Sequence, residues 1–286
     1  MSEQPTVCCV MLTRDRPELA AKAVECFRRQ TYENKHLLAY NNGQEDLNFG
    51  SATDCVEYVD RSPLSCMGAL TIGDMRNKAI RQVPGAQIII HWDDDDWSHP
   101  NRIAEQVAFL QMSGADVVGY NQMLFWRDPP CKCDDTTPHG IDGSGAWLYT
   151  AAAGLTPALG TSLCYWRKTW ERKPFNPALP KASGGMSEET EFLRGLKCVA
   201  IGARGEPFQH VSEPSRWKNA LGFDRPPDYL ADYLILNDPR MIARIHGSNF
   251  GKYDIENQIA RGCNAKPGEG WARVPEWDDR VREILA

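Results

Sequence analysis

The chain has 286 residues, of which 42% are hydrophobic, with nine each of tryptophan, tyrosine and phenylalanine. That length and apolar content support one large α/β domain or two small ones, and they exclude an intrinsically disordered chain. The 32 basic and 38 acidic residues give a net charge of -6, which excludes an overall basic field for nucleic acid and leaves only a local groove for that purpose.

The amino-terminal sequence MSEQPTVCCVML has neither the basic region nor the cleavage site of a secretory signal. No apolar run approaches the roughly 20 residues that span a bilayer, and we expect a soluble, cytoplasmic protein with no membrane span. The ten cysteines are scattered, which favours reduced thiols over a disulfide framework. Cys131 and Cys133 form a C-x-C pair, but without a second pair at zinc-finger spacing it is a weak indication of zinc.

Strand and helix patterns alternate over the first 120 residues. An apolar run at residues 7–12 indicates a strand, and the helix expected after it has Pro17 in its first turn and Asp15 and Glu18 at capping-box spacing. Strands are also expected at residues 36–40, 87–92 and 115–120, and helices at residues 73–83 and 103–110, with a loose connection over residues 44–71. This order predicts an α/β domain with parallel strands.

The pattern loosens after residue 120. Residues 161–166 indicate a strand and residues 187–196 a helix, both surrounded by loops rich in proline and glycine. From about residue 215 onward, aromatic, proline and charged residues mix without sustained periodicity, so we expect this part to wrap around the domain as an extension.

Four adjacent carboxylates, Asp93 to Asp96, follow the apolar strand in QIIIHWDDDDW. Their mutual repulsion is costly unless they are solvated or bind a cation. Alternation along a strand would put Asp93 and Asp95 on one side, and two carboxylates form half of a Mg²⁺ or Mn²⁺ site that water and substrate phosphates complete. The carboxyl end of a strand is where open sheets place ligands. The alternative is a solvated turn or a cap for the next helix.

Several motifs occur in one order: TRDRPEL, QTY, MRNKAI and DDDDW. By the presence and order of these motifs, the chain resembles the family 2 glycosyltransferases of the GT-A fold. The resemblance implies a Rossmann-like, mixed and mainly parallel sheet flanked by helices. It also implies transfer of a sugar, with inversion, from a nucleotide-diphosphate-sugar (a UDP-sugar as first expectation) to an acceptor hydroxyl, with Mn²⁺ or Mg²⁺ as cofactor.

The resemblance also assigns site residues. Asp95 is the expected metal ligand, with Asp93 and a late histidine, His246 or else His210. The residues expected at the nucleotide are Thr13, Arg14, Asp15, Asn41, Asn42, Arg76, Asp93 and Asp94.

Asn41 and Asn42 depart from the family, which usually has an acidic pair there that contacts uracil. An amide donates as well as accepts hydrogen bonds, so the nucleotide need not be UDP. Asn42-Gly43 is also a strong turn signal, and a plain turn is at least as well supported.

In the second half, GTSLCYWRKTW and GGMSEETEFLRGL resemble the strand and the helix start that carry the catalytic base in this family. The resemblance places the base at Glu189, with Glu188 as second candidate. The alternative is that acidic residues simply favour a first helical turn.

The implied organisation is a single GT-A domain, with residues 1–112 as its nucleotide-sugar half, residues 113–214 as its acceptor and catalytic half, and residues 215–286 as the extension. A glycan, a small molecule, a protein or a modified nucleic-acid base remains open as acceptor. Two other functions are kept: a sugar nucleotidyltransferase, and a non-catalytic nucleotide- or glycan-binding module.

Overall fold

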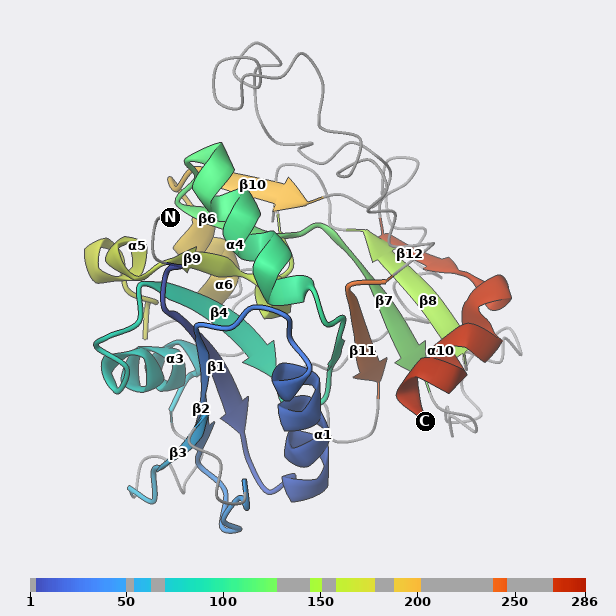
Figure 1. The fold of residues 1–286 in the computed structure, drawn as a ribbon, viewed down its shortest axis with the longest axis horizontal. Coiled ribbons are helices and arrows are strands. Elements are labelled where there is room, and N and C mark those ends of the chain that lie inside the picture. The colour runs from blue at the N-terminus through green and yellow to red at the C-terminus, as the bar shows by residue number, and fades with distance from the viewer. Residues whose placement is uncertain are drawn as a thin grey trace.

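Two β-sheets form the framework of the molecule (Figure 1). This computed structural model describes residues 4–49, 54–62, 70–127, 145–150, 158–177, 188–201, 239–245 and 270–286. Within these residues the larger sheet has seven strands in the order β10-β6-β9-β4-β1-β2-β3. In chain order they are β1 (Val7–Thr13), β2 (Lys35–Asn41), β3 (Cys55–Val59), β4 (Ile88–Asp93), β6 (Val117–Tyr120), β9 (Cys164–Trp166) and β10 (Cys198–Ile201).

The strands of the larger sheet pair in parallel, with β9 as the exception. β9 lies between β4 and β6 and is antiparallel to both. On the β4 side of β9, the strands β4, β1, β2 and β3 form a parallel block, which brings their carboxyl ends to one edge. The mixed, mainly parallel sheet expected from the sequence is confirmed.

Helices cover both faces of this sheet, and β1 shows how. Val7, Cys9 and Met11 are buried in one core with α1 (Pro17–Arg28) and α4 (Arg102–Ser113). Cys8 and Val10 point to the other core, which contains α3 (Ile72–Arg81), α5 (Arg167–Arg172) and α6 (Glu188–Leu193). The continuously apolar β1 is therefore buried on both faces, as parallel strands usually are.

The second sheet lies beside the first, as Figure 1 shows, and has the order β12-β8-β7-β11-β5 in the described residues. Its strands are β5 (Trp97–Ser98), β7 (Gln122–Arg127), β8 (Gly145–Thr150), β11 (Met241–Ile245) and β12 (Gly270–Arg273). The carboxyl-terminal helix α10 (Asp278–Leu285) packs on it through Val281, next to Trp126 and Trp277. Segments far apart in the sequence thus complete this sheet.

Two local expectations are wrong. α1 begins at Pro17 as expected, but its N-cap is Arg16 and no side chain caps it. Asp15 does not form a capping box with Glu18, because Asp15 adopts a positive φ of 52° and its carboxylate accepts a hydrogen bond from the Gln44 N–H instead. The loose stretch after residue 44 contains the edge strand β3.

The described cysteines are free thiols, and most are buried. Burial raises the pKa of the Cys8 thiol to about 12, which fits the reduced thiols expected from the sequence. Cys131 and Cys133 lie outside the described residues. No helix in the described part of the chain has the length and hydropathy to cross a membrane.

Candidate active site

The acidic residues form a turn at the carboxyl edge of the larger sheet. β4 ends at Asp93, and the chain turns at residues 94 and 95 before β5. The register pairs Leu12 with Asp93 and Thr13 with Asn41, so the ends of β1, β2 and β4 meet here. We call residues 93–96 the acidic turn.

The β1–α1 connection holds one part of the acidic turn. Thr13 Oγ1 donates to Asp94 Oδ2 at 2.6 Å. Arg16 Nη1 lies 3.1 Å from Asp94 Oδ1 and 3.1 Å from Asp95 Oδ2. The expected residue Thr13 therefore reaches the site by supporting Asp94, and Arg16 is a partner that the sequence reading did not include.

A second connection holds the other end of the turn. Thr161 Oγ1, in the 3-10 turn Gly160–Ser162, donates to Asp96 Oδ2 at 2.8 Å. Arg102, which is fully buried, donates to the carbonyl oxygens of His91 and Thr161 at 2.7 and 3.0 Å. These contacts fix the turn from both sides.

The acidic turn carries more negative charge than its surroundings neutralise. Burial raises the pKa of Asp94 to about 6, and repulsion from Asp95 adds to this, while Thr13 and Arg16 oppose it. Burial also raises the pKa of Asp93 and Asp96, again with repulsion from Asp95. A bound divalent cation would relieve that repulsion.

No group of three His, Cys, Asp or Glu side chains in the described ranges is arranged to hold a metal ion. The donor chemistry nevertheless fits Mg²⁺ or Mn²⁺, because these ions take oxygen ligands and commonly use one or two carboxylates plus substrate phosphates. Asp94 and Asp96 are buried, whereas Asp93 and Asp95 are half-buried. His246 and His210 lie outside the described residues.

The buried Arg76 and the first two glutamates of α6, Glu188 and Glu189, form a cluster next to the turn. Arg76 is 5% exposed; its Nη2 lies 3.3 Å from Glu189 Oε1 and its Nε 3.8 Å from Glu188 Oε1. Asp93 also acts on Arg76 electrostatically. Arg76 is therefore neither an exposed helix charge nor a residue turned toward solvent, and it links the turn to the expected base.

The two glutamates differ in their surroundings. Burial raises the pKa of Glu188 to about 8, with repulsion from Glu189 adding and Arg76 opposing. Glu188 Oε1 is buried without a hydrogen bond. Glu189 has the closer contact with Arg76 and packs against Gly160, where an added Cβ would lie 2.5 Å from the carboxylate carbon. Burial and repulsion from Glu189 therefore favour the protonated form of Glu188.

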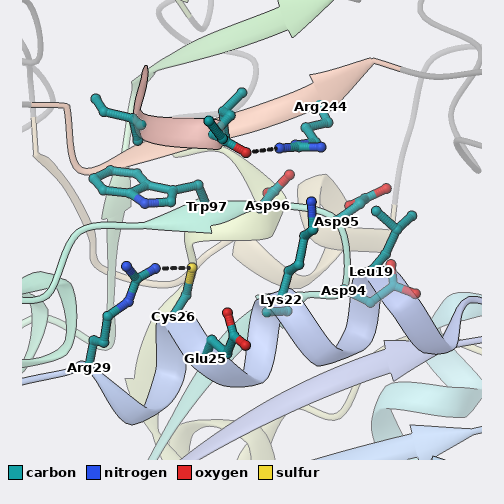
Figure 2. A pocket seen from close by; sticks show the side chains of 14 residues that line it. Leu19, Lys22, Glu25, Cys26, Arg29, Asp94, Asp95, Asp96, Trp97 and Arg244 are labelled. Carbon is teal, nitrogen blue, oxygen red and sulfur yellow. Dashed lines mark hydrogen bonds between the residues drawn. The ribbon is translucent and has the colours of Figure 1, made fainter. Parts of the chain in front are cut away.

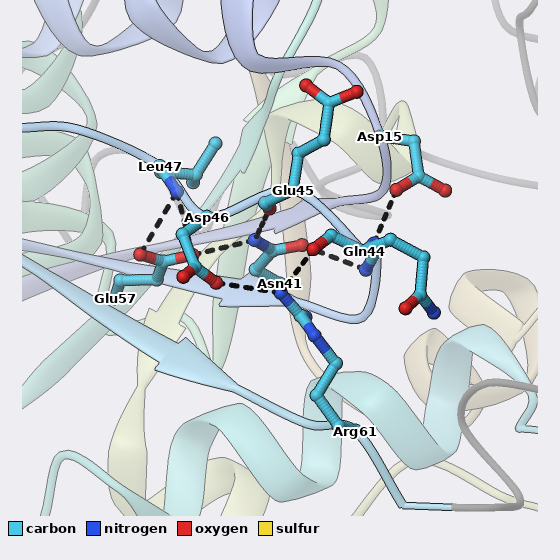
Figure 3. Close-up of polar contacts among 9 residues, drawn as sticks. Asp15, Asn41, Gln44, Glu45, Asp46, Leu47, Glu57 and Arg61 are labelled. Carbon is cyan, nitrogen blue, oxygen red and sulfur yellow. Dashed lines mark hydrogen bonds and ion pairs between the residues drawn. The ribbon is translucent and has the colours of Figure 1, made fainter.

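Asn41 is engaged within the protein, as Figure 3 shows. Its Nδ2 donates to the Glu45 carbonyl at 2.7 Å and to Glu57 Oε1 at 2.6 Å, and its Oδ1 accepts from the Gly43 N–H at 2.8 Å. The Leu47 N–H also donates to Glu57. These bonds use the whole amide of Asn41, which supports the turn interpretation of this segment.

The remaining expected nucleotide residues differ in accessibility. Arg14 is exposed, with its Nε 3.7 Å from Asp15 Oδ2. Asn42 is 7% exposed, and its N–H donates to the Thr13 carbonyl. Gly43 comes so close to Asp15 that an added Cβ would lie 2.4 Å from the Asp15 nitrogen. The ends of β1 and β2 are thus tightly joined beside the acidic turn.

The acidic turn also borders a pocket of about 160 Å³ between α1 and the end of α10. Figure 2 shows Lys22 extending from α1 past Asp95, with Arg244 on the opposite wall. Arg244 Nη2 donates to the Leu285 carbonyl at 2.6 Å. The carboxyl-terminal helix therefore forms one wall beside the turn.

Comparison with known proteins bears directly on this edge of the sheet. Residues 8–125 match the model of glycosyl transferase family 2. The resemblance to this family is thus confirmed over that segment, and the coarse activity that this family 2 segment supports is glycosyl transfer. The segment contains the acidic turn and Arg76, whereas Glu188 and Glu189 lie beyond it.

Solved structures give distant likenesses. S. aureus TarS 1–349 aligns with a TM-score of 0.44 at 11% identity, over 65% of this chain and 53% of that one. The same TarS portion in complex with UDP aligns with a TM-score of 0.42 at 10% identity, again over 65% of this chain and 53% of that one. The mannosyltransferase PcManGT from Pyrobaculum calidifontis, in complex with GDP-Man and Mn²⁺, aligns with a TM-score of 0.45 at 11% identity, over 82% of this chain and 70% of that one. The chain spans about half the length of TarS 1–349. No curated protein matches the chain.

Sequence reasoning missed three functional contacts around the family 2 segment: Arg16 on the acidic turn, Thr161 on Asp96 and Gly160 against Glu189. Arg16 stands next to the expected residues 13–15 and carries the nearest positive charge, so charge complementarity with the turn was the available signal. Gly160 and Thr161 lie in the motif GTSLCYW, for which only a strand was expected. Their contacts depend on the placement of the antiparallel strand β9.

Proposed function

We propose that this protein is a metal-dependent, inverting glycosyltransferase that moves a sugar from a nucleotide-diphosphate-sugar to an acceptor hydroxyl. The observation that carries the proposal is the acidic turn at the carboxyl end of β4, where four adjacent carboxylates gather and the pKa values of Asp93, Asp94 and Asp96 are raised by burial and by repulsion from Asp95. The family 2 match of the surrounding segment supports the same activity.

In this proposal Asp95 and Asp93 hold Mn²⁺ or Mg²⁺, because they are the two less buried carboxylates of the turn. When bound, such a cation supplies charge neutralisation to a departing nucleoside diphosphate. Thr13 and Arg16 keep Asp94 and Asp95 in place, and Thr161 does the same for Asp96. The turn then needs little rearrangement to receive the diphosphate, which favours catalysis.

Glu189 serves as the base. It takes the proton of the acceptor hydroxyl as that oxygen bonds to the anomeric carbon, while the bond from this carbon to the diphosphate oxygen breaks and its electron pair leaves with the diphosphate. A single displacement of this kind inverts the anomeric centre. The Arg76 guanidinium at 3.3 Å favours the ionised carboxylate that a base requires.

The donor is a sugar linked to a nucleoside diphosphate, with UDP as the first choice. TarS has been crystallised with UDP, and PcManGT with GDP-Man and Mn²⁺. Because the side chain of Asn41 is engaged inside the protein, we do not assign base recognition to it, and other nucleotides belong in the test.

The test is thermal unfolding with UDP-, GDP-, dTDP- and CDP-sugars, each with and without Mn²⁺, followed by a measurement of nucleotide release. A ligand at about 100 times its Kd stabilises the fold by about 2.7 kcal/mol. We expect a shift with one nucleotide that requires the metal, together with slow release of the nucleoside diphosphate to water. A shift without any release would favour the binding module instead, and no shift with any donor would contradict the proposal.

A further inference from the structure

Arg76 owes its position to the residue that follows it in α3. Asn77 Nδ2 donates to the Phe175 carbonyl at 2.8 Å, and its Oδ1 accepts from the Phe175 N–H at 3.1 Å and from Trp170 Nε1 at 2.8 Å. These three bonds fix α3 to α5 and to the segment that follows it. The rotation of α3 is thereby set, and with it the direction in which Arg76 leaves the helix.

Arg76 is the cation of a buried cluster that is rich in carboxylates. Its guanidinium lies 5.9 Å from the ring centre of Phe175, and its two ion-pair partners, Glu188 and Glu189, are both on α6. A buried charge must be paired, and removing one partner leaves the other uncompensated. The side chain of Glu189 is therefore tied to the position of Arg76.

Glu189 is confined on its other side by Gly160. No side chain larger than hydrogen fits at Gly160 without meeting the Glu189 carboxylate. The Gly160 carbonyl is itself held, because His91 Nδ1 lies 2.6 Å from it. The carboxylate thus has a rigid wall on one face and a fixed guanidinium on the other.

We propose that Arg76 is a positioning residue for the base: held by Asn77, it orients the Glu189 carboxylate against Gly160 so that one oxygen stays directed at the acceptor hydroxyl. This inference rests on the proposed function, in which Glu189 accepts the proton. The family resemblance implied a contact between Arg76 and the nucleotide. In this inference Arg76 acts through Glu189 instead.

The first experiment measures the contact itself and does not depend on activity. Melting temperatures are compared for wild type, Arg76→Met, Glu189→Gln and the double variant. If Arg76 holds Glu189, the double variant loses less than the sum of the two single losses, because each single change leaves a buried partner unpaired. Additive losses would overturn the inference whether or not the protein is a transferase.

The second experiment measures release of the nucleoside diphosphate from the UDP-, GDP-, dTDP- and CDP-sugars with Mn²⁺, with water as acceptor. We expect Arg76→Met to lower kcat by about 100-fold with the donor KM unchanged within about 2-fold, because a misplaced base costs turnover and not donor binding. Arg76→Lys, which keeps the charge, should recover about 10-fold of this loss. Arg76→Lys also serves if Arg76→Met fails to fold.

Arg240→Met is the matched control, since Arg240 Nε makes a buried ion pair of 2.8 Å with Glu105 Oε2 on α4. It should lower the melting temperature while leaving kcat within about 2-fold of wild type. If Arg76→Met keeps the wild-type kcat, or if the only change is a higher KM for the donor, Arg76 does not position the base and the proposed function still stands. If wild type neither binds nor cleaves any donor, both proposals fall, because no base is then present to position.

Discussion

Two groups of carboxylates lie at the carboxyl edge of the parallel block of the larger sheet, and their surroundings differ. At the ends of β2 and β3, burial opposes the ionisation of Asp60, but hydrogen bonds from Lys78, Tyr40 and Ser62 hold its pKa well below its usual value. At the end of β4, burial and mutual repulsion raise the pKa of Asp94 to about 6. The same edge of the sheet thus contains one carboxylate whose charge is stabilised by hydrogen-bond partners, and one group of carboxylates with excess negative charge.

The comparison separates structural carboxylates from candidate ligands. Glu57, like Asp60, is saturated by partners from the chain, since it accepts from Asn41 and from the Leu47 N–H. In the acidic turn Arg16 contacts Asp94 and Asp95, and the pKa of Asp94 is nevertheless raised by burial. Perturbed groups of this kind mark functional sites more often than saturated ones do.

The largest expected effect is at Asp95. Asp95→Asn removes one charge of the acidic turn, and we expect donor turnover to fall by at least about 1,000-fold, because the developing charge on the diphosphate loses its cation. The metal-dependent shift in melting temperature with the donor should disappear, while the melting temperature without ligand changes little. A variant that keeps the metal-dependent shift would remove Asp95 from the ligand set.

The next comparison is within α6. Glu189→Gln should lower turnover by about 100-fold or more, as expected for loss of a general base. Glu188→Gln should stay within about 5-fold of wild type, because a side chain that is already protonated near pH 7 resembles a neutral amide. The two rates, measured at pH 7 on the same donor, test the assignment, and the reverse order would move the base to Glu188.

Asn41→Asp tests whether the segment after β2 serves structure or base recognition. An aspartate would restore an acidic residue where the family has one, but it would bring a carboxylate to the position now 2.6 Å from Glu57. We expect a loss of about 3 kcal/mol in the free energy of unfolding, in the range for a buried unpaired charge. The UDP-dependent shift should not increase, and a gain in UDP affinity would restore the base-recognition role.

Asp60→Asn has the smallest expected effect and a defined pH dependence. At pH 7 it should lower the free energy of unfolding by about 2 kcal/mol and leave donor binding unchanged. Because the pKa of Asp60 is lowered in the folded state, its contribution is complete above the unfolded pKa of about 3.9 and is lost as the pH falls below it. Urea unfolding at pH 7 and pH 3 should show a smaller difference between the two proteins at pH 3.

The sequence predicted the parts of the site that depend on local pattern. The apolar run before Asp93 predicted β4 and placed the acidic residues at its end, and the periodicity of Met75, Ala79 and Ile80 predicted α3, on which they are buried. β3 was not predicted, because it is an edge strand in which the apolar Val56 is 55% exposed. Its sequence therefore lacks the apolar and polar alternation of a half-buried strand.

The contacts between distant segments could not be read from the sequence. Arg76 and Glu189 are 113 positions apart, and their ion pair requires α6 to pack beside α3 across β9. An arginine in a helix and a glutamate at a helix start each have an ordinary local explanation. Only the tertiary arrangement, with Asn77 fixing α3 and Gly160 leaving room for the carboxylate, brings them together.

The position of β9 also determines how the molecule can be divided. β4 and β6 are both complete before residue 121, yet they contact each other only through β9, which pairs with each in antiparallel register. A truncated protein ending after β7 would leave the apolar edge of β4, Ile88 to Ile90, open to other chains, and exposed edges of this kind aggregate. The family 2 segment therefore contains most of the site but not a self-sufficient folding unit, because a three-residue strand from the second half covers this edge of β4.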